Sequence, residues 1–277
     1  MAVMKRDMME NWKTNLYRLV GCYSGIAMAL IFAMKGIERS IELNISGDLY
    51  YQFCTRIYTM IVFCSYFYLL VCASKIMEVM NTKNKRISYM MLPATIGEKF
   101  ISRVIYVCIT SMVIFFVGLF FAELTRLALF PLFDAPEEFS RFCLFDIMSV
   151  PFYDIIYINP KSYGISSTFI IYIFLISDCL LNHSIYILGG TYFRKHAFIK
   201  TIGICMAIFI IFTYTYINLS REKIISSIYN NEAFWSNLEV LLPILSIIFL
   251  LLTIINWVLS YRLFKNSQIT DRKLFRR

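Results

Sequence analysis

Six long runs of apolar residues divide the chain, and they limit its fold more than any other feature. A nearly uncharged apolar run of about 18 residues or more can cross the hydrocarbon core of a bilayer as a helix. Strands of a membrane barrel alternate apolar and polar residues, and these runs do not, so each run is predicted to be a helix. The predicted spans cover residues 19–34, 57–74, 104–122, 165–187, 201–219 and 240–261.

The composition agrees with a membrane-spanning chain, because 59% of the 277 residues are hydrophobic and only 16% are charged. Soluble domains contain about a quarter charged residues. The sequence shows no internal repeat and no low-complexity tract. We therefore expect an all-α, multi-pass membrane protein with six transmembrane helices, in which residues 1–277 form a single transmembrane domain.

Basic residues are concentrated in four segments, which comprise residues 1–18, 75–103, 194–200 and 262–277. These segments hold most of the 27 Lys and Arg residues and few of the 18 Asp and Glu residues. Because Lys and Arg concentrate in cytoplasmic loops, both termini are predicted to be cytoplasmic. The net charge of +9 is thus attributed to topology. No nucleic-acid partner is expected, since no basic stripe is interleaved with aromatic residues.

The first 18 residues carry an apolar stripe, because Met4, Met8, Trp12 and Leu16 recur every four residues. The basic residues of this segment lie off the stripe, as in a helix that rests in the membrane interface. We predict an amphipathic interfacial helix over residues 1–18, facing the inner leaflet. The alternative is a simple extension of the first span.

Catalytic and metal-binding motifs are missing from the sequence. It contains no G-x-x-x-x-G-K-[ST] phosphate-binding loop, no G-x-S-x-G and no H-E-x-x-H. The two histidines, His183 and His196, have no cluster of Cys or carboxylate residues at metal-ligand spacing, and most of the eight cysteines lie in apolar runs. We therefore expect no enzymatic activity in this chain, no cofactor and no metal site.

The loop between the second and third spans contains RISYMMLPATIGEKFISR, residues 86–103. Ile87, Met90 and Met91 are spaced to share one face of a short helix, with Arg86 and Tyr89 beside that face. Methionine offers an adaptable apolar surface on which a partner can dock. The first part of this loop is therefore predicted to be a short helix with a docking face.

A proline then separates this short helix from the third span. Pro93 discourages helix at Leu92 and removes a backbone donor. Thr95 and Glu98 have the spacing of a capping box, so a new helix is predicted to begin there and to continue through Lys99 into the membrane. A short helix joined in this way to a span forms a lever. The alternative is an ordinary basic loop with a convenient turn.

The segment R-I-S-Y-M-M-L-P-A-T-x-x-E-K-F resembles the connection between spans two and three in the permeases of type-two ATP-binding-cassette (ABC) exporters, which are bacterial membrane proteins. The six spans, the cytoplasmic termini and the amphipathic N-terminal helix are similar to that family as well. The resemblance covers most of the chain at the level of topology, but its motif covers only residues 86–100.

The resemblance implies a permease in the inner (cytoplasmic) membrane, working as a homodimer with a separate ATPase subunit that the short helix contacts. In this interpretation Pro93 forms the elbow between the short helix and the helix of span three, and Glu98 caps the start of that second helix. The family usually places its large external element between spans five and six, whereas the long external loop here is residues 123–164. The residues that the resemblance assigns to ATPase coupling are Arg86, Ile87, Tyr89, Met90, Met91, Leu92, Pro93, Thr95, Glu98 and Lys99.

Two further features lie inside predicted spans. Asp178 is near the middle of the fourth span, where a carboxylate is costly and functional by default, and Asn182 lies one turn away on the same face. The alternative is that Asp178 is protonated or hydrogen-bonded and only holds helices together. Gly21 and Gly25 form a small-x-x-x-small pattern that permits either a dimer contact or close packing inside the molecule.

Three classes of function remain open on the sequence. The first is the non-catalytic permease subunit of an ABC exporter, which the resemblance implies. The second is a secondary transporter that uses Asp178 as its coupling site, although no inverted repeat and no pair of spans broken by Gly or Pro is visible. The third is an accessory or sensory membrane protein without transport. Nothing in the spans identifies a substrate.

Overall fold

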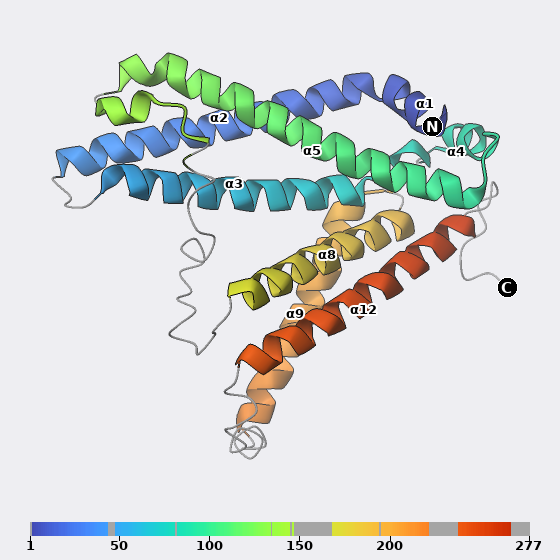
Figure 1. The fold of residues 1–277 in the computed structure, drawn as a ribbon. Coiled ribbons are helices and arrows are strands. Elements are labelled where there is room, and N and C mark those ends of the chain that lie inside the picture. The colour runs from blue at the N-terminus through green and yellow to red at the C-terminus, as the bar shows by residue number, and fades with distance from the viewer. Residues whose placement is uncertain are drawn as a thin grey trace. The chain divides into compact units, whose positions relative to one another are not determined.

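The computed structural model describes residues 2–43, 48–80, 82–133, 135–144, 146, 168–193, 195–221 and 238–266. Helices are the regular elements of these ranges, and Figure 1 shows their order along the chain. The α-helices are α1 (Ala2–Glu10), α2 (Trp12–Glu42), α3 (Leu49–Ser74), α4 (Lys83–Met90), α5 (Ile96–Leu129), α8 (Thr168–Tyr192), α9 (Ala197–Arg221) and α12 (Leu238–Lys265). Three single turns of 3₁₀-helix are η1 (Glu78–Met80), η2 (Phe130–Leu132) and η3 (Glu137–Ser140).

Six of the helices in the described ranges are long and apolar enough to cross a membrane: α2, α3, α5, α8, α9 and α12. Each contains most or all of one predicted span, so the predicted all-α fold with six potential transmembrane helices is confirmed. Cytoplasmic termini stay a prediction. Residues 147–164 of the predicted external loop and residues 267–277 of the basic tail lie outside the described residues.

The N-terminal segment differs from the predicted single helix over residues 1–18. Helix α1 ends at Glu10 and α2 begins at Trp12. Between them the Asn11 side-chain amide donates to the carbonyl oxygen of Asp7 at 2.8 Å, and the Asn11 backbone amide donates to the same oxygen at 3.1 Å. The predicted apolar stripe continues across the break, since Met8 and Trp12 are both exposed. Residues 12–18 therefore extend the first span, and only α1 remains as a separate amphipathic helix.

Helix α5 continues past the predicted end of the third span at Ala122 as far as Leu129. Two charged residues in this extra length, Glu123 and Arg126, are one turn apart and form a buried ion pair at 2.7 Å. Because each neutralises the other, the helix carries them without ending. The predicted span ended at Ala122, directly before Glu123, whereas the helix itself continues through both charged residues.

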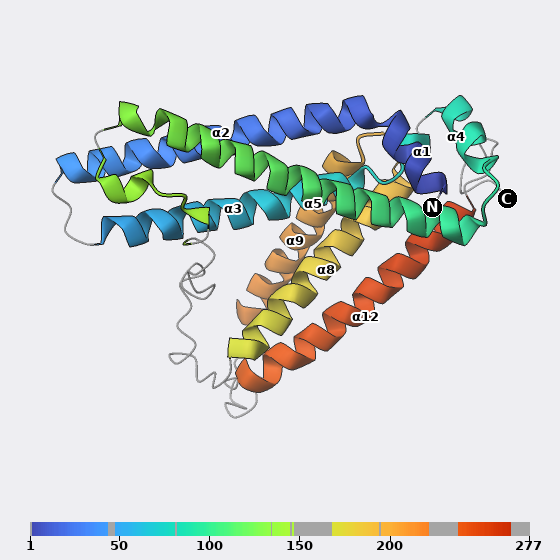
Figure 2. The same ribbon diagram turned by 45° about the horizontal axis from the view of Figure 1, so that its top comes forward.

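The chain divides into two compact units, and their relative placement is not described. Unit 1 comprises residues 1–69 and 106–159, and it contains α1, α2, most of α3 and most of α5. Within it, α2, α3 and α5 run alongside one another, as Figures 1 and 2 show. Helices α2 and α5 approach closely at Gly118, where an added Cβ would lie 3.4 Å from the Tyr23 nitrogen. Met34, Ile37 and other apolar side chains form the core of this unit.

Unit 2 comprises residues 70–105 and 160–277, and it contains the end of α3, η1, α4, the first turns of α5, and helices α8, α9 and α12. Helix α8 lies along α12 (Figures 1 and 2), and the Asn256 side-chain amide of α12 donates to the Ser184 hydroxyl of α8 at 3.0 Å. The small buried side chains of Ser177, Ser246 and Ser260 allow these two helices to pack closely. That the two units act as one transmembrane domain stays a prediction.

Candidate functional site

The predicted lever lies entirely in unit 2 and begins with the short helix α4. The Thr82 hydroxyl accepts from the Lys85 backbone amide at 3.4 Å and caps the start of this helix. Its last helical residue is Met90, and the chain then turns, with the Ala94 amide donating to the Leu92 carbonyl at 2.8 Å. Pro93 occupies this turn, as its fixed backbone favours.

The next helix, α5, starts with both hydrogen bonds of a capping box. The Thr95 backbone amide donates to the Glu98 carboxylate at 2.8 Å. In return, the Glu98 amide donates to the Thr95 hydroxyl at 3.3 Å. These two bonds satisfy amides that have no partner inside the helix, so they fix the point at which α5 begins.

Two side chains hold α4 against the start of α5. The Tyr89 hydroxyl donates to the Lys99 carbonyl oxygen at 3.1 Å, and the Lys99 ammonium donates to the Met90 carbonyl oxygen at 2.8 Å. Tyr89 and Lys99 are only 2% and 4% exposed. The lysine also places a positive charge at the carboxyl end of α4, which the dipole of that helix favours. The angle between the two helices is thus fixed by buried hydrogen bonds as well as by the proline.

The sequence-assigned coupling residues divide into an inner and an outer group. Arg86, Tyr89 and Lys99 are buried, so they support the segment from inside. The outer surface consists of the exposed Met91 and Pro93 together with the partly buried Ile87, Met90 and Leu92. We call Met91, Leu92 and Pro93 the exposed apex.

The apex is connected to other helices of unit 2 by residues for which sequence reasoning assigned no partner. Arg103 of α5 donates from Nε to the Ile76 carbonyl oxygen, just beyond α3, at 2.9 Å. Phe100, in the second turn of α5, packs on Tyr261 and Phe264 near the end of α12, with ring centroids 5.7 and 5.4 Å apart. A displacement of the apex would therefore act on α12 as well as on α5.

The intramembrane pair Asp178 and Asn182 lies on α8. The Asn182 side-chain amide donates to the Asp178 carboxylate at 3.0 Å and to the Asp178 carbonyl oxygen at 2.9 Å. Both side chains are partly buried. The pair is therefore present as a local polar site within one helix, and its role stays a prediction.

Unit 1 contains a buried polar cluster that sequence reasoning missed. Arg126 donates to both oxygens of Glu123 and to the carbonyl oxygens of Phe139 and Arg141, and Glu123 also accepts from the Cys143 amide at 2.9 Å. The Arg126 guanidinium lies 5.8 Å from the ring centroid of Phe53. Burial and the adjacent carboxylate raise the pKa of the Cys143 thiol. The sequence signal for this cluster was the E-x-x-R spacing of Glu123 and Arg126, directly after an apolar run.

This cluster fastens a connecting segment to the end of α5. Residues 139–143 supply two carbonyl oxygens and one amide to the ion pair, and the side chains of Phe139 and Cys143 join the apolar core of unit 1. The contacts satisfy the buried charges, as buried charges require. They therefore assign this cluster a structural role.

The two glycines that were considered for a dimer contact face outward. No atom lies within 4 Å of a Cβ built on Gly21 or Gly25. In the described part of the chain, the close approaches occur elsewhere, at Gly118, Gly189 and Gly190. Within unit 1, nothing therefore packs closely on Gly21 or Gly25, and the choice between a dimer contact and internal packing stays a prediction.

No group of three or more His, Cys, Asp or Glu residues is placed to hold a metal ion in the ranges that the structure describes. Comparison of the sequence with protein-family models gives no match. Comparison with curated proteins and with solved structures gives no match either. The six apolar helices are those of an integral, multi-pass membrane protein.

Proposed function

We propose that this chain is the permease subunit of an ABC-type exporter, in which a separate ATPase subunit docks on the exposed apex and drives transport. The observation that carries the proposal is an apolar apex held at a fixed angle by buried hydrogen bonds. Met91 is 75% exposed, whereas Tyr89 and Lys99 directly behind it are buried. An exposed apolar side chain on a fixed support is the arrangement expected of a docking contact.

The connections of the apex supply a route for mechanical coupling. Lys99 of α5 bonds to the carbonyl oxygen of Met90, directly before the apex, and Phe100 of α5 packs on Phe264 of α12. A pull by the ATPase on the apex would thus act on the start of α5 and on the end of α12 together. Docking of the ATPase can shift the permease between two conformations only by the difference between its binding free energies for the two conformations.

The test is copurification in mild detergent, followed by ATPase and transport assays on the complex. We expect a nucleotide-hydrolysing subunit to copurify with the native chain. Replacement of Met90 and Met91 by Asp should release it, because the charged groups would have to be desolvated in the contact. Insertion of the spans should be unchanged, since both residues lie outside the predicted membrane segments. Normal binding and transport by this double variant would refute the proposed role of the apex.

We further propose that two copies of the chain form the transporter, as the family resemblance implies. The glycines Gly21 and Gly25 support this, because neither puts a side chain between α2 and a second helix, and no atom lies within 4 Å of a Cβ built on either. Cross-linking in native membranes should trap a homodimer. A particle that stays monomeric while the ATPase is bound would refute the dimer.

The Asp178–Asn182 pair supports a second candidate function, a secondary transporter that couples transport to ion or proton movement. An intramembrane carboxylate with one amide partner is a reasonable coupling site. Asp178→Asn removes the charge with little change of shape, so it should abolish transport in this case. Transport that requires ATP and survives Asp178→Asn would exclude the secondary transporter. Transport driven by an ion gradient without ATP would exclude the exporter.

A further inference from the structure

The polar pair Asp178 and Asn182 lies near the middle of α8, inside a predicted span. The Asn182 amide nitrogen, which carries two hydrogens, donates to the Asp178 carbonyl oxygen at 2.9 Å and to the carboxylate oxygen Oδ1 at 3.0 Å. In the described part of the chain, no Lys, Arg or His forms an ion pair with Asp178, and neither the second carboxylate oxygen Oδ2 nor the Asn182 carbonyl oxygen Oδ1 accepts a hydrogen bond. The pair thus presents two acceptor atoms and no spare donor.

Aromatic side chains flank the pair along the same stripe of α8. Phe174 lies four residues before the carboxylate and Tyr186 four residues after the amide, so the four side chains follow one another on one face of the helix. Phe174 packs on Phe249 of α12, with ring centroids 5.7 Å apart, and Tyr186 packs on Phe198 of α9, with ring centroids 5.4 Å apart. The polar pair therefore lies between aromatic contacts to two different helices.

Helix α9 does not cover the pair. Helices α8 and α9 run in opposite directions (Figures 1 and 2), and they meet where a Cβ on Gly189 would lie 1.9 Å from the Thr201 hydroxyl. The pair lies seven to eleven residues before Gly189, about level with residues 208–212, which lie equally far after Thr201. All five of these consecutive residues are 61% to 68% exposed, whereas a helix packed on its neighbour buries one face. Within unit 2, the side of α8 that carries the pair is therefore left open by α9.

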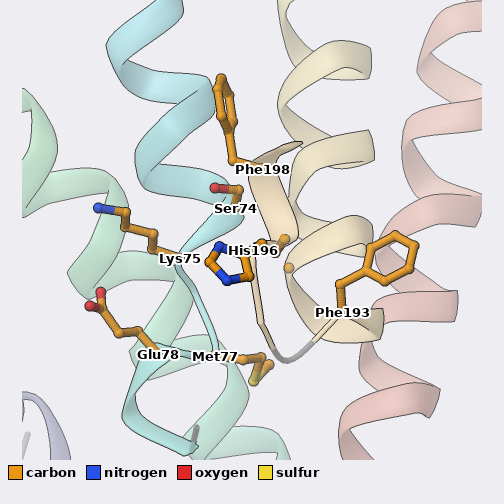
Figure 3. Close-up of a pocket in the computed structure, with 9 residues that line it drawn as sticks. Ser74, Lys75, Met77, Glu78, Phe193, His196 and Phe198 are labelled. Carbon is orange, nitrogen blue, oxygen red and sulfur yellow. The ribbon is translucent and has the colours of Figure 1, made fainter. Parts of the chain in front are cut away.

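A cavity at the other end of α8 does not offer a comparable site. It has a volume of about 230 Å³ and lies between the end of α3, the η1 turn, the end of α8 and the start of α9. Figure 3 shows that the charged ends of Lys75 and Glu78 point away from His196 and from the apolar lining. The charges around this cavity thus do not converge on one position, whereas the acceptor atoms of Asp178 and Asn182 are adjacent.

The chemistry of the pair restricts the class of ligand. Acceptor atoms without a spare donor favour a ligand that is both a cation and a hydrogen-bond donor, as a protonated amine is, and the carboxylate repels anions. The partly buried ring of Phe174 stabilises a nearby cation and adds apolar surface. Metal ions take several protein ligands, and no group of three or more His, Cys, Asp or Glu is placed to hold one in the described ranges.

We propose that Asp178 and Asn182 bind the protonated amine of a lipophilic organic cation that reaches α8 from the bilayer. The ammonium group donates to Oδ2 of Asp178 and to Oδ1 of Asn182, and its apolar substituent lies against Phe174. The carboxylate supplies the opposite charge without which a cation is costly at this depth. That the bound cation is also the transported substrate rests on the transport function proposed above.

The test is equilibrium dialysis of the full chain in phosphatidylcholine nanodiscs, with empty nanodiscs to measure partition into lipid alone. The tritium-labelled probes are phenylbutylammonium, phenylbutanol and phenylbutyrate, which share one apolar part and differ in the charge of the polar end. We expect saturable binding of phenylbutylammonium to the native chain, and for the other two probes only the partition that empty nanodiscs show. Displacement of the ammonium probe by sodium chloride, but not by an equal concentration of choline chloride, would indicate a metal-ion site instead and overturn the proposal.

Three variants assign the roles of the side chains. Asp178→Asn removes the charge with little change of shape, so it should weaken binding of phenylbutylammonium at least about tenfold, the loss expected for one charge-assisted hydrogen bond. Phe174→Leu keeps an apolar side chain but removes the ring, so it should weaken the same probe about two- to fivefold. Glu137→Gln is the matched control, because it removes the same charge from an exposed residue of unit 1 outside the predicted spans, and it should leave binding unchanged.

Two results would overturn the proposal. One is equal binding of phenylbutanol and phenylbutylammonium by the native chain, a comparison that needs no variant. The other is an equal loss of binding in Asp178→Asn and Glu137→Gln. The assay contains neither ATP nor an ATPase, so failure of an ATPase to copurify would refute the proposed function and leave the binding result unchanged. Conversely, a cation that binds no better than the alcohol would refute this site and leave the docking of the ATPase unaffected.

Discussion

Met91→Ala is the most direct single substitution for testing the docking contact. Complete burial of a methionine side chain is worth about 1.5–3 kcal/mol. Met91 is already one quarter buried in the free chain, since it is 75% exposed. Docking can therefore bury at most the remaining three quarters, which is worth about 1–2 kcal/mol, or a factor of roughly 5 to 30 in affinity.

The same exposure predicts what the substitution leaves unchanged. An exposed side chain outside a packed core contributes little to stability, within about 0.5 kcal/mol. The melting temperature of the isolated chain in detergent should thus stay the same. Affinity for the ATPase is measured by titration of the labelled permease with that subunit.

Met9→Ala is the matched control, because Met9 is 66% exposed but lies on α1, away from the α4–α5 connection in the sequence. It should leave the affinity for the ATPase unchanged. The reasoning is refuted if Met91→Ala binds the ATPase as tightly as the native chain. It is refuted as well if both alanine variants weaken binding to the same extent.

Three other substitutions probe the remaining features. Pro93→Ala should keep the ATPase bound but lower transport per ATP hydrolysed, because the elbow can straighten into one helix. Glu123→Ala should destabilise the chain by about 3–5 kcal/mol, since it leaves the buried Arg126 charge without its carboxylate, and thermal unfolding in detergent measures this loss. Gly190→Ala should lower the yield of folded protein, because its Cβ would lie 2.5 Å from a backbone oxygen. Gly203→Ala, with no atom within 4 Å, should be neutral or stabilising.

Each of these expectations has an outcome that contradicts it. Unchanged coupling in Pro93→Ala means that the Tyr89 and Lys99 bonds alone fix the angle. For the ion pair, Glu137→Ala is the control at an exposed carboxylate, and an equal loss of stability in both variants contradicts the assigned role of Glu123. A normally folded Gly190→Ala protein would show that α3 and α8 separate more easily than their close packing indicates.

The sequence predicted the long helices well because their signal is local. Apolar runs and the absence of charge follow directly from the requirements of a lipid environment, so all six appeared at the expected places. The capping box of Thr95 and Glu98 was equally readable, since both hydrogen bonds join residues three apart. The helix ends were less accurate, because a charge can lie inside a helix when its partner is one turn away.

Contacts between distant residues were not predictable from one sequence. Lys99 was assigned to ATPase coupling, but its ammonium turns inward to a carbonyl oxygen nine positions earlier. The contact of Phe100 with Phe264 joins residues that no local pattern relates. The close approach of α8 to the end of α3 was not predicted either. Its signal in the sequence was the pair of adjacent glycines in I-L-G-G-T-Y, which leaves room for the Ser74 backbone.

The Glu123–Arg126 cluster also has a consequence for how the chain is made. During synthesis Glu123 leaves the ribosome first, and Arg126 follows three residues later. An unpaired charge in an inserting helix is costly, so prompt pairing eases the entry of this end of α5 into the bilayer. The carbonyl oxygens of Phe139 and Arg141 become available only afterwards, when the following segment has been translated. The cluster is thus completed in the order in which its parts are synthesised, and the connecting segment is the last part to join it.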